Sequence, residues 1–207
     1  MYMKHCTFLL AGLISLPLVF TACSNDDEPD NTKVYPRHAI ALSAEQTAQK
    51  EQANRFAYNL WNDLSEYSTS DNMVFSPLSL YQALSMTANG TDGETLKAFK
   101  KFLAGDENAS IEEINEFNRY LMSELPKVDP SVKLSLANMY CSKDITPLYG
   151  FVSTMTDYYN APFYTYTSPA EGFKFVNNWA KERSEGEITN FLNSEDELGA
   201  LDIFNAT

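Results

Sequence analysis

The sequence predicts an α+β fold, and three observations lead to that prediction. The chain has 207 residues, of which 44% are hydrophobic, so it can bury one sizeable core or form part of a larger domain. Four segments before residue 126 repeat apolar residues at the three- and four-residue spacing of a helix, and two later segments are also expected to be helical. Residues 132–141 instead alternate with the two-residue period of a strand. Segments with strand character lie far apart in the chain, so we expect a sheet assembled from distant strands and covered by helices.

The expected helices are bounded by capping and stop signals. Ser43 and Ser110 each precede Gln or Glu three residues later, which is the pattern of a capping box. Ser76 followed by Pro77 is typical of an N-cap and the first helical residue, and Gly105 marks a helix end. The helices are expected at residues 43–67, 76–88, 91–104, 110–125, 147–159 and 168–183.

Strands are expected between these helices and after the last one. They are placed at residues 72–75, as a short buried strand, and at 132–141, 162–167 and 201–207. The last strand stops within itself at Thr207, and a buried strand without its neighbour leaves backbone groups unpaired at a cost of about 1–3 kcal/mol each. We therefore expect the chain to be truncated relative to a complete domain.

Residues 1–22 are predicted to be a signal peptide. Lys4 precedes an apolar run at residues 8–20, which is shorter than the roughly 20 residues of a membrane-spanning helix. The run ends in Leu-Val-Phe-Thr-Ala directly before Cys23. This ending resembles the lipobox of bacterial lipoproteins, which implies that Cys23 carries lipid and anchors the protein to a membrane. The alternative is an ordinary secretory signal with an incidental cysteine.

A flexible acidic tether is expected at residues 23–39. The stretch from Ser24 to Asn31 contains four carboxylates and no apolar residue, so it has nothing to bury. An acidic run after the lipidated cysteine resembles the export signal of some Gram-negative lipoproteins, which implies an outer membrane lipoprotein at the cell surface. With Cys6 removed and Cys23 blocked, only Cys141 remains, and we expect no internal disulfide.

Charge and histidine content exclude several functions. The chain has 15 basic and 28 acidic residues, and its net charge of -13 repels phosphate backbones, so we expect no nucleic-acid partner. Two histidines, His5 and His38, are too few for the usual multi-histidine metal sites. The sequence contains no nucleophile elbow, phosphate-binding glycine loop or metalloprotease motif. We therefore expect no catalytic residues, no metal, no cofactor and no enzyme activity.

The stretch between Asn54 and Gly105 carries motifs specific enough to suggest a family. They are Asn-Arg-Phe-Ala-Tyr-Asn-Leu from Asn54, Asn-Met-Val-Phe-Ser-Pro-Leu-Ser-Leu from Asn72, and Asn-Gly-Thr-Asp-Gly-Glu-Thr from Asn89. Together they resemble the first three helices of a serpin. The likeness continues in order through residues 136–138, 175–179, 184–188 and 203–206. It covers residues 40–207 and implies serpin helices A to F with part of the large central β-sheet, truncated before the C-terminal half of the domain.

The resemblance also implies a conformational site. Ser76, Ser79 and Asn205 fall where serpins have the shutter, a hydrogen-bonded cluster beneath two strands that must part. Small hydroxyls and an amide can exchange hydrogen-bond partners as strands separate, and Ser76 fits a helix N-cap as well. Two residues depart from the family pattern: Asp202 stands where an apolar residue is usual, and Glu187 where a lysine is common.

The function implied by the resemblance is inhibition of serine or cysteine proteases. Serpins let the protease cleave a reactive loop, and then insert that loop as a new strand of the sheet. The loop belongs to the C-terminal half of the family domain, so we expect this chain not to inhibit by itself, and proteases to be partners only if that half is supplied. The alternative is a non-inhibitory, surface-exposed binding lipoprotein that docks partners on its serpin-like helices.

Overall fold

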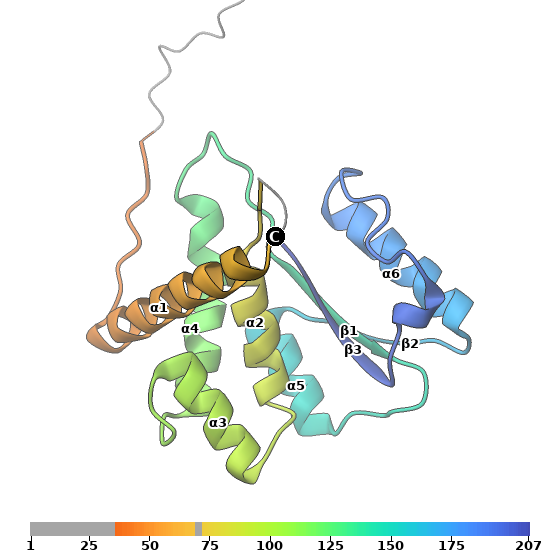
Figure 1. The fold of residues 1–207 in the computed structure, drawn as a ribbon, viewed down its shortest axis with the longest axis horizontal. Coiled ribbons are helices and arrows are strands. Elements are labelled where there is room, and N and C mark those ends of the chain that lie inside the picture. The colour runs from red at the N-terminus through yellow and green to blue at the C-terminus, as the bar shows by residue number, and fades with distance from the viewer. Residues whose placement is uncertain (1–35, 69–71) are drawn as a thin grey trace, which may run out of the picture. The chain divides into compact units, whose positions relative to one another are not determined.

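A computed structural model describes residues 36–68 and 72–207. The predicted signal peptide, Cys23 and most of the expected tether lie outside these residues. All six predicted helices are confirmed (Figure 1). They are α1 Ala44–Tyr67, α2 Pro77–Ala88, α3 Gly93–Ala104, α4 Ile111–Glu124, α5 Tyr149–Tyr159 and α6 Pro169–Arg183, with short 3-10 helices η1 at Leu125–Lys127 and η2 at Glu195–Glu197. No helix among the described residues is both long and apolar enough to cross a membrane.

Most helix ends follow the predicted signals. The capping box of α1 is present, since Gln46 N donates to Ser43 Oγ at 3.1 Å and Ser43 N donates to Gln46 Oε1 at 3.0 Å. Gly105 ends α3 with a φ of 82°, a conformation that favours glycine. Ser110 occupies the N-cap position of α4, but its side chain makes no capping bond, so the predicted second box is wrong. Acidic residues in the first turn of α4 stabilise that end through the helix dipole instead.

Three strands form one sheet in the order β2-β1-β3. They are β1 Ala137–Ser142, β2 Phe163–Thr165 and β3 Leu201–Ala206. β1 pairs with β2 in parallel and with β3 antiparallel, so the predicted sheet of distant strands is confirmed. β1 begins later than predicted, and all six of its residues are buried. The alternating side chains of β1 therefore point to two faces that are both buried.

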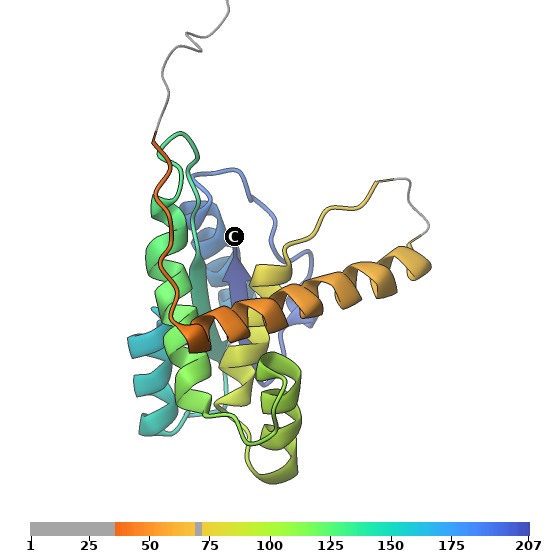
Figure 2. The same ribbon diagram turned by 90° about the vertical axis from the view of Figure 1, so that its left-hand side faces the viewer.

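The two faces of the sheet are covered by different helices. Met139 and Cys141 of β1 pack in a cluster with Trp179 of α6, whereas Tyr140 packs with Tyr159 of α5. Figure 1 shows α6 on one side of the strands and α2 and α5 on the other. Helices α1 to α4 enclose a further cluster around Phe56, Tyr81, Leu103, Ile114 and Phe117. Figure 2 shows α1 running across α2, with its C-terminal turns extending beyond that helix.

The predicted buried strand at residues 72–75 is wrong. These residues form no strand, and the side chain of Val74 is 98% exposed. Phe75 instead stacks on Trp61 of α1, with ring centroids 5.9 Å apart. None of the three strands in the described residues pairs with this segment. An apolar run cannot form a β-ladder without a partner strand.

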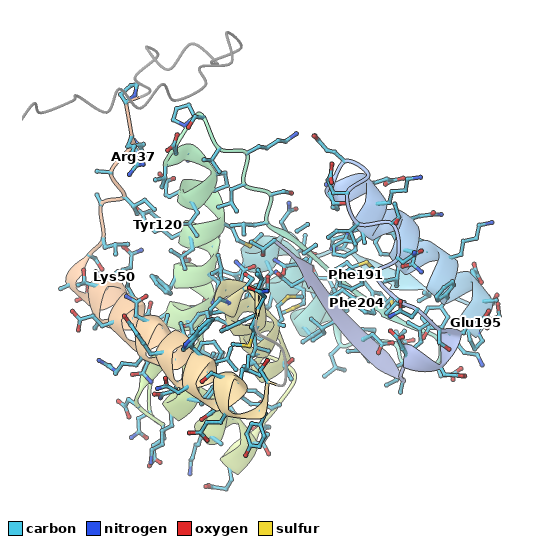
Figure 3. All side chains as sticks on the ribbon, turned by 45° about the horizontal axis from the view of Figure 1, so that its top comes forward. Arg37, Lys50, Tyr120, Phe191, Glu195 and Phe204 are labelled. Atoms are coloured by element: carbon cyan, nitrogen blue, oxygen red, sulfur yellow. The ribbon has the colours of Figure 1, made fainter. Side chains whose placement is uncertain are left out.

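The segment before α1 lies along α4 and η1. His38 N donates to the carbonyl of Val128 at 2.8 Å, and Arg37 Nε lies 3.4 Å from a carboxylate oxygen of Asp129. Further along, the hydroxyl of Tyr120 donates to the carbonyl of Ala41. Figure 3 shows Arg37 and Tyr120 on the same flank of the molecule. The tether boundary at residue 39 stays a prediction, but the last expected tether residues already contact the folded domain.

Candidate functional site

Helix α2 packs against β3 (Figure 1). It carries a row of polar side chains at Ser76, Ser79 and Gln82. Ser76 caps the helix, since its Oγ accepts a hydrogen bond from Ser79 N at 3.2 Å, and Pro77 occupies the first turn. Gln82 follows Ser79 by three residues, as Ser79 follows Ser76, and this spacing places all three on one side of the helix. Gln82 is 0% exposed, so the row ends inside the protein.

Strands β1 and β3 bring two asparagines together above this row. The antiparallel register pairs Asn138 with Asn205, and Asn205 Nδ2 donates to Asn138 Oδ1 at 2.6 Å. Asn138 Nδ2 donates to the backbone carbonyl of Tyr159, at the end of α5, at 3.0 Å. Asn138 is 2% exposed, so this carbonyl anchors a buried amide pair.

Two links join the amide pair to α2. Asn205 Nδ2 also donates to Gln82 Oε1 at 2.8 Å. Ser79 Oγ donates to Thr207 Oγ1 at 2.8 Å, and Thr207 Oγ1 donates to Asn205 Oδ1 at 3.0 Å. We refer to Ser79, Gln82, Asn138, Asn205 and Thr207 as the Asn205 cluster. It connects one helix to two strands through side chains alone.

The structure brings two of the three predicted site residues into this cluster. Ser79 and Asn205 are joined through Thr207, whereas Ser76 contributes through its capping bond to Ser79. Sequence reasoning missed Gln82, Asn138 and Thr207. Gln82 could have been found, because it continues the three-residue spacing of the two serines. Asn138 could not, because its place depends on the register between β1 and β3.

The Asn205 cluster holds only hydroxyl and amide groups, which do not titrate near neutral pH. It therefore offers no general acid, general base or activated nucleophile. Its groups can exchange hydrogen-bond partners as the backbone moves. Among residues 36–68 and 72–207, no three or more His, Cys, Asp or Glu side chains are grouped so that they could hold a metal ion.

Cys141 lies in β1, with its side chain on the opposite face of the strand from Asn138. Its side chain is 0% exposed, and burial, with a smaller contribution from the charge of Asp202, raises the pKa of the Cys141 thiol to about 12. Because the thiolate is the nucleophilic form, this environment suppresses reactivity at neutral pH.

β3 is an edge strand of the described sheet. Five of its six residues are half-buried, and only Ala206 is buried. An edge strand presents backbone N–H and C=O groups with which a further strand can pair. The Asn205 cluster thus lies beneath a strand to which another strand could be added.

Comparison with known proteins decides the family. The family model described as "Serpin (serine protease inhibitor)" matches residues 51–207. The chain belongs to the serpin family. Relatives include Leukocyte elastase inhibitor A of Rattus norvegicus, 33% identical over 141 residues, which are 66% of this chain and 36% of that protein. Alpha-2-antiplasmin of Bos taurus is 28% identical over 189 residues, which are 87% of this chain and 37% of that protein.

Solved serpin structures resemble the fold described above. Tengpin, a thermophilic serpin in the latent state, gives a TM-score of 0.68 at 29% identity and is matched over 81% of this chain and 44% of its own. The native stressed conformation of Arabidopsis AtSerpin1 gives 0.66 at 26% identity, over 80% of this chain and 44% of its own. The predicted serpin-like α+β fold is confirmed. The serpin chain spans less than half the length of these relatives.

Proposed function

We propose that this serpin chain contributes the N-terminal portion of an inhibitor of serine or cysteine proteases. The inhibitor takes up its own cleaved reactive loop as a strand next to β3. The family description and relatives named as elastase inhibitors support the protease target class. The observation that carries the proposal is the Asn205 cluster beneath an edge strand, because strand uptake requires β3 to move relative to α2.

The cluster suits such a movement because its bonds are of two kinds. The Asn138–Asn205 bond lies within the sheet and travels with it, whereas the Ser79–Thr207 and Gln82–Asn205 bonds cross from sheet to helix. A hydrogen bond of this type contributes only about 0.5–1.5 kcal/mol net, and a hydroxyl or amide can form a new one elsewhere. The contact can therefore be remade at low cost, which an interlocked apolar core does not allow.

A gel assay tests the proposed inhibition. The protein expressed from its own gene is incubated with an elastase-type protease, a subtilisin-type protease and a papain-type cysteine protease. We expect a complex with at least one of them that survives SDS, because loop cleavage leaves the protease covalently attached. Residues 1–207 by themselves are expected to form none. Proteases with a blocked active-site nucleophile serve as controls, and cleavage of the protein without any stable complex would overturn the proposal.

We further propose that Cys23 is lipidated and holds the protein at the outer face of the outer membrane. The support is the small-residue ending before Cys23 and the acidic stretch after it. The wild type is expected to sediment with membranes and to be accessible to external protease. Cys23→Ser is expected to be released in soluble form, with Cys141→Ser as the matched control. Equal membrane retention of Cys23→Ser and wild type would contradict lipid anchoring at this residue.

A second candidate function is partner binding without inhibition. An apolar groove between α1 and residues 73–77 favours it, since Trp61 is 48% exposed and Val74 is 98% exposed. In this case the proteases above would form only complexes that dissociate in SDS and that also form with a blocked active site. Trp61→Ser is expected to weaken such complexes. Tyr67→Ser, outside the groove on the same helix, is the matched control.

A further inference from the structure

Gln82 is a fully buried amide of which one half has no partner. Its Oε1 accepts from Asn205 Nδ2 at 2.8 Å. Its Nε2 is buried and has no hydrogen-bond partner among the described residues. Most buried side-chain polar groups are paired, so an unpaired donor next to the cluster requires an explanation.

The direction of the hydrogen bonds in the cluster explains it. The carbonyl of Tyr159 can only accept, so Asn138 must present Nδ2 to it and Oδ1 to Asn205. Asn205 must then present Nδ2 to Asn138, and the same Nδ2 reaches Gln82, which therefore presents Oε1. Rotating any one of these amides by half a turn would place two donors or two acceptors face to face. The carbonyl of α5 thus fixes Gln82 in the orientation that leaves Nε2 unpaired.

We propose that Gln82 is a positioning residue that holds β3 against α2 through its hydrogen bond with Asn205, and that breaking this bond costs little free energy. This inference rests on the proposed function only in that β3 must move over α2. Closing the contact gains one hydrogen bond to Asn205 but keeps Nε2 from any acceptor among residues 36–68 and 72–207. Burying an unpaired donor shifts the equilibrium between the closed and the open contact towards the open form by a factor of about five to a hundred. This factor equals or exceeds the one by which a single hydrogen bond favours the closed form. Opening the contact loses the bond to Asn205 and lets Nε2 find a partner.

Amide hydrogen exchange of the full chain tests this, because it reports local opening of each strand and helix. Gln82→Met preserves side-chain length and removes both the unpaired Nε2 and the acceptor of Asn205. Losing the cost of the buried donor outweighs losing one hydrogen bond, and opening would now expose an apolar group. We expect amides of residues 201–207 to exchange about tenfold more slowly than in the wild type. Gln82→Asn keeps a buried amide but withdraws it from Asn205, so we expect faster exchange in the same residues.

Asn118→Leu is the matched control. Asn118 is also 0% exposed and also has one buried polar atom without a partner, Oδ1, but it lies in α4 and its Nδ2 donates to Ile114 O at 2.9 Å. We expect this variant to leave exchange in β3 unchanged. Equal slowing in Asn118→Leu and Gln82→Met, or no change in β3 for either Gln82 variant, would overturn the assignment. The measurement involves no protease, so it stands or fails separately from the inhibition assay.

Discussion

Asp202 is a carboxylate on β3, directly across the sheet from Cys141. Both of its oxygens lie 3.0 Å from Gly199 N, yet burial raises the pKa of Asp202 above its ordinary value of 3.8. The ionised form therefore destabilises the folded state at neutral pH, and the penalty is relieved as the pH falls through the folded pKa.

Asp202→Asn keeps an acceptor and removes the charge. We expect a higher urea midpoint than wild type near pH 7 and a difference that shrinks towards about pH 4. Asp63→Asn, on the exposed surface of α1, is the control; lower stability of Asp202→Asn near neutral pH would contradict the prediction.

Helix α6 packs closely against Tyr166 and Leu198 because Gly172 has no side chain. A Cβ at this position would lie 2.9 Å from both Leu198 Cδ1 and the ring of Tyr166. We expect Gly172→Ala to lower the free energy of unfolding by about 1–3 kcal/mol, because the helix must shift or its neighbours must leave their rotamers. Gly150→Ala in α5 meets nothing within 4 Å, and we expect it to leave stability unchanged or raise it by up to about 1 kcal/mol. Urea unfolding measures both variants, and equal effects would show that close packing at α6 is not the cause.

The sequence predicts the helices of this fold better than its strands. Helices were predictable because their signals are local: Ser43 caps α1 within three residues, and Gly105 ends α3 by its own backbone conformation. Strands depend on partners elsewhere in the chain, so residues 72–75 were assigned to a strand that the described sheet does not contain. The place of Asn138 in the cluster is not predicted either, because it depends on the pairing of β1 with β3. Ser79 and Asn205 are predicted as site residues from the serpin resemblance, not from periodicity.

At the scale of the whole molecule, the folded domain begins before its first helix. Leu42 packs against the cluster around Phe56, and the backbone of His38 and Ala41 is hydrogen-bonded to the α4–η1 region. Deleting residues 1–36 removes none of these contacts, so we expect an unchanged Tm. Deleting residues 1–42 removes all of them, and we expect a loss of about 1–3 kcal/mol from apolar burial and hydrogen bonds. Thermal unfolding of both proteins measures the difference. Equal Tm values would move the end of the tether from residue 39 to the start of α1, because the contacts of residues 37–42 would then contribute nothing to folding.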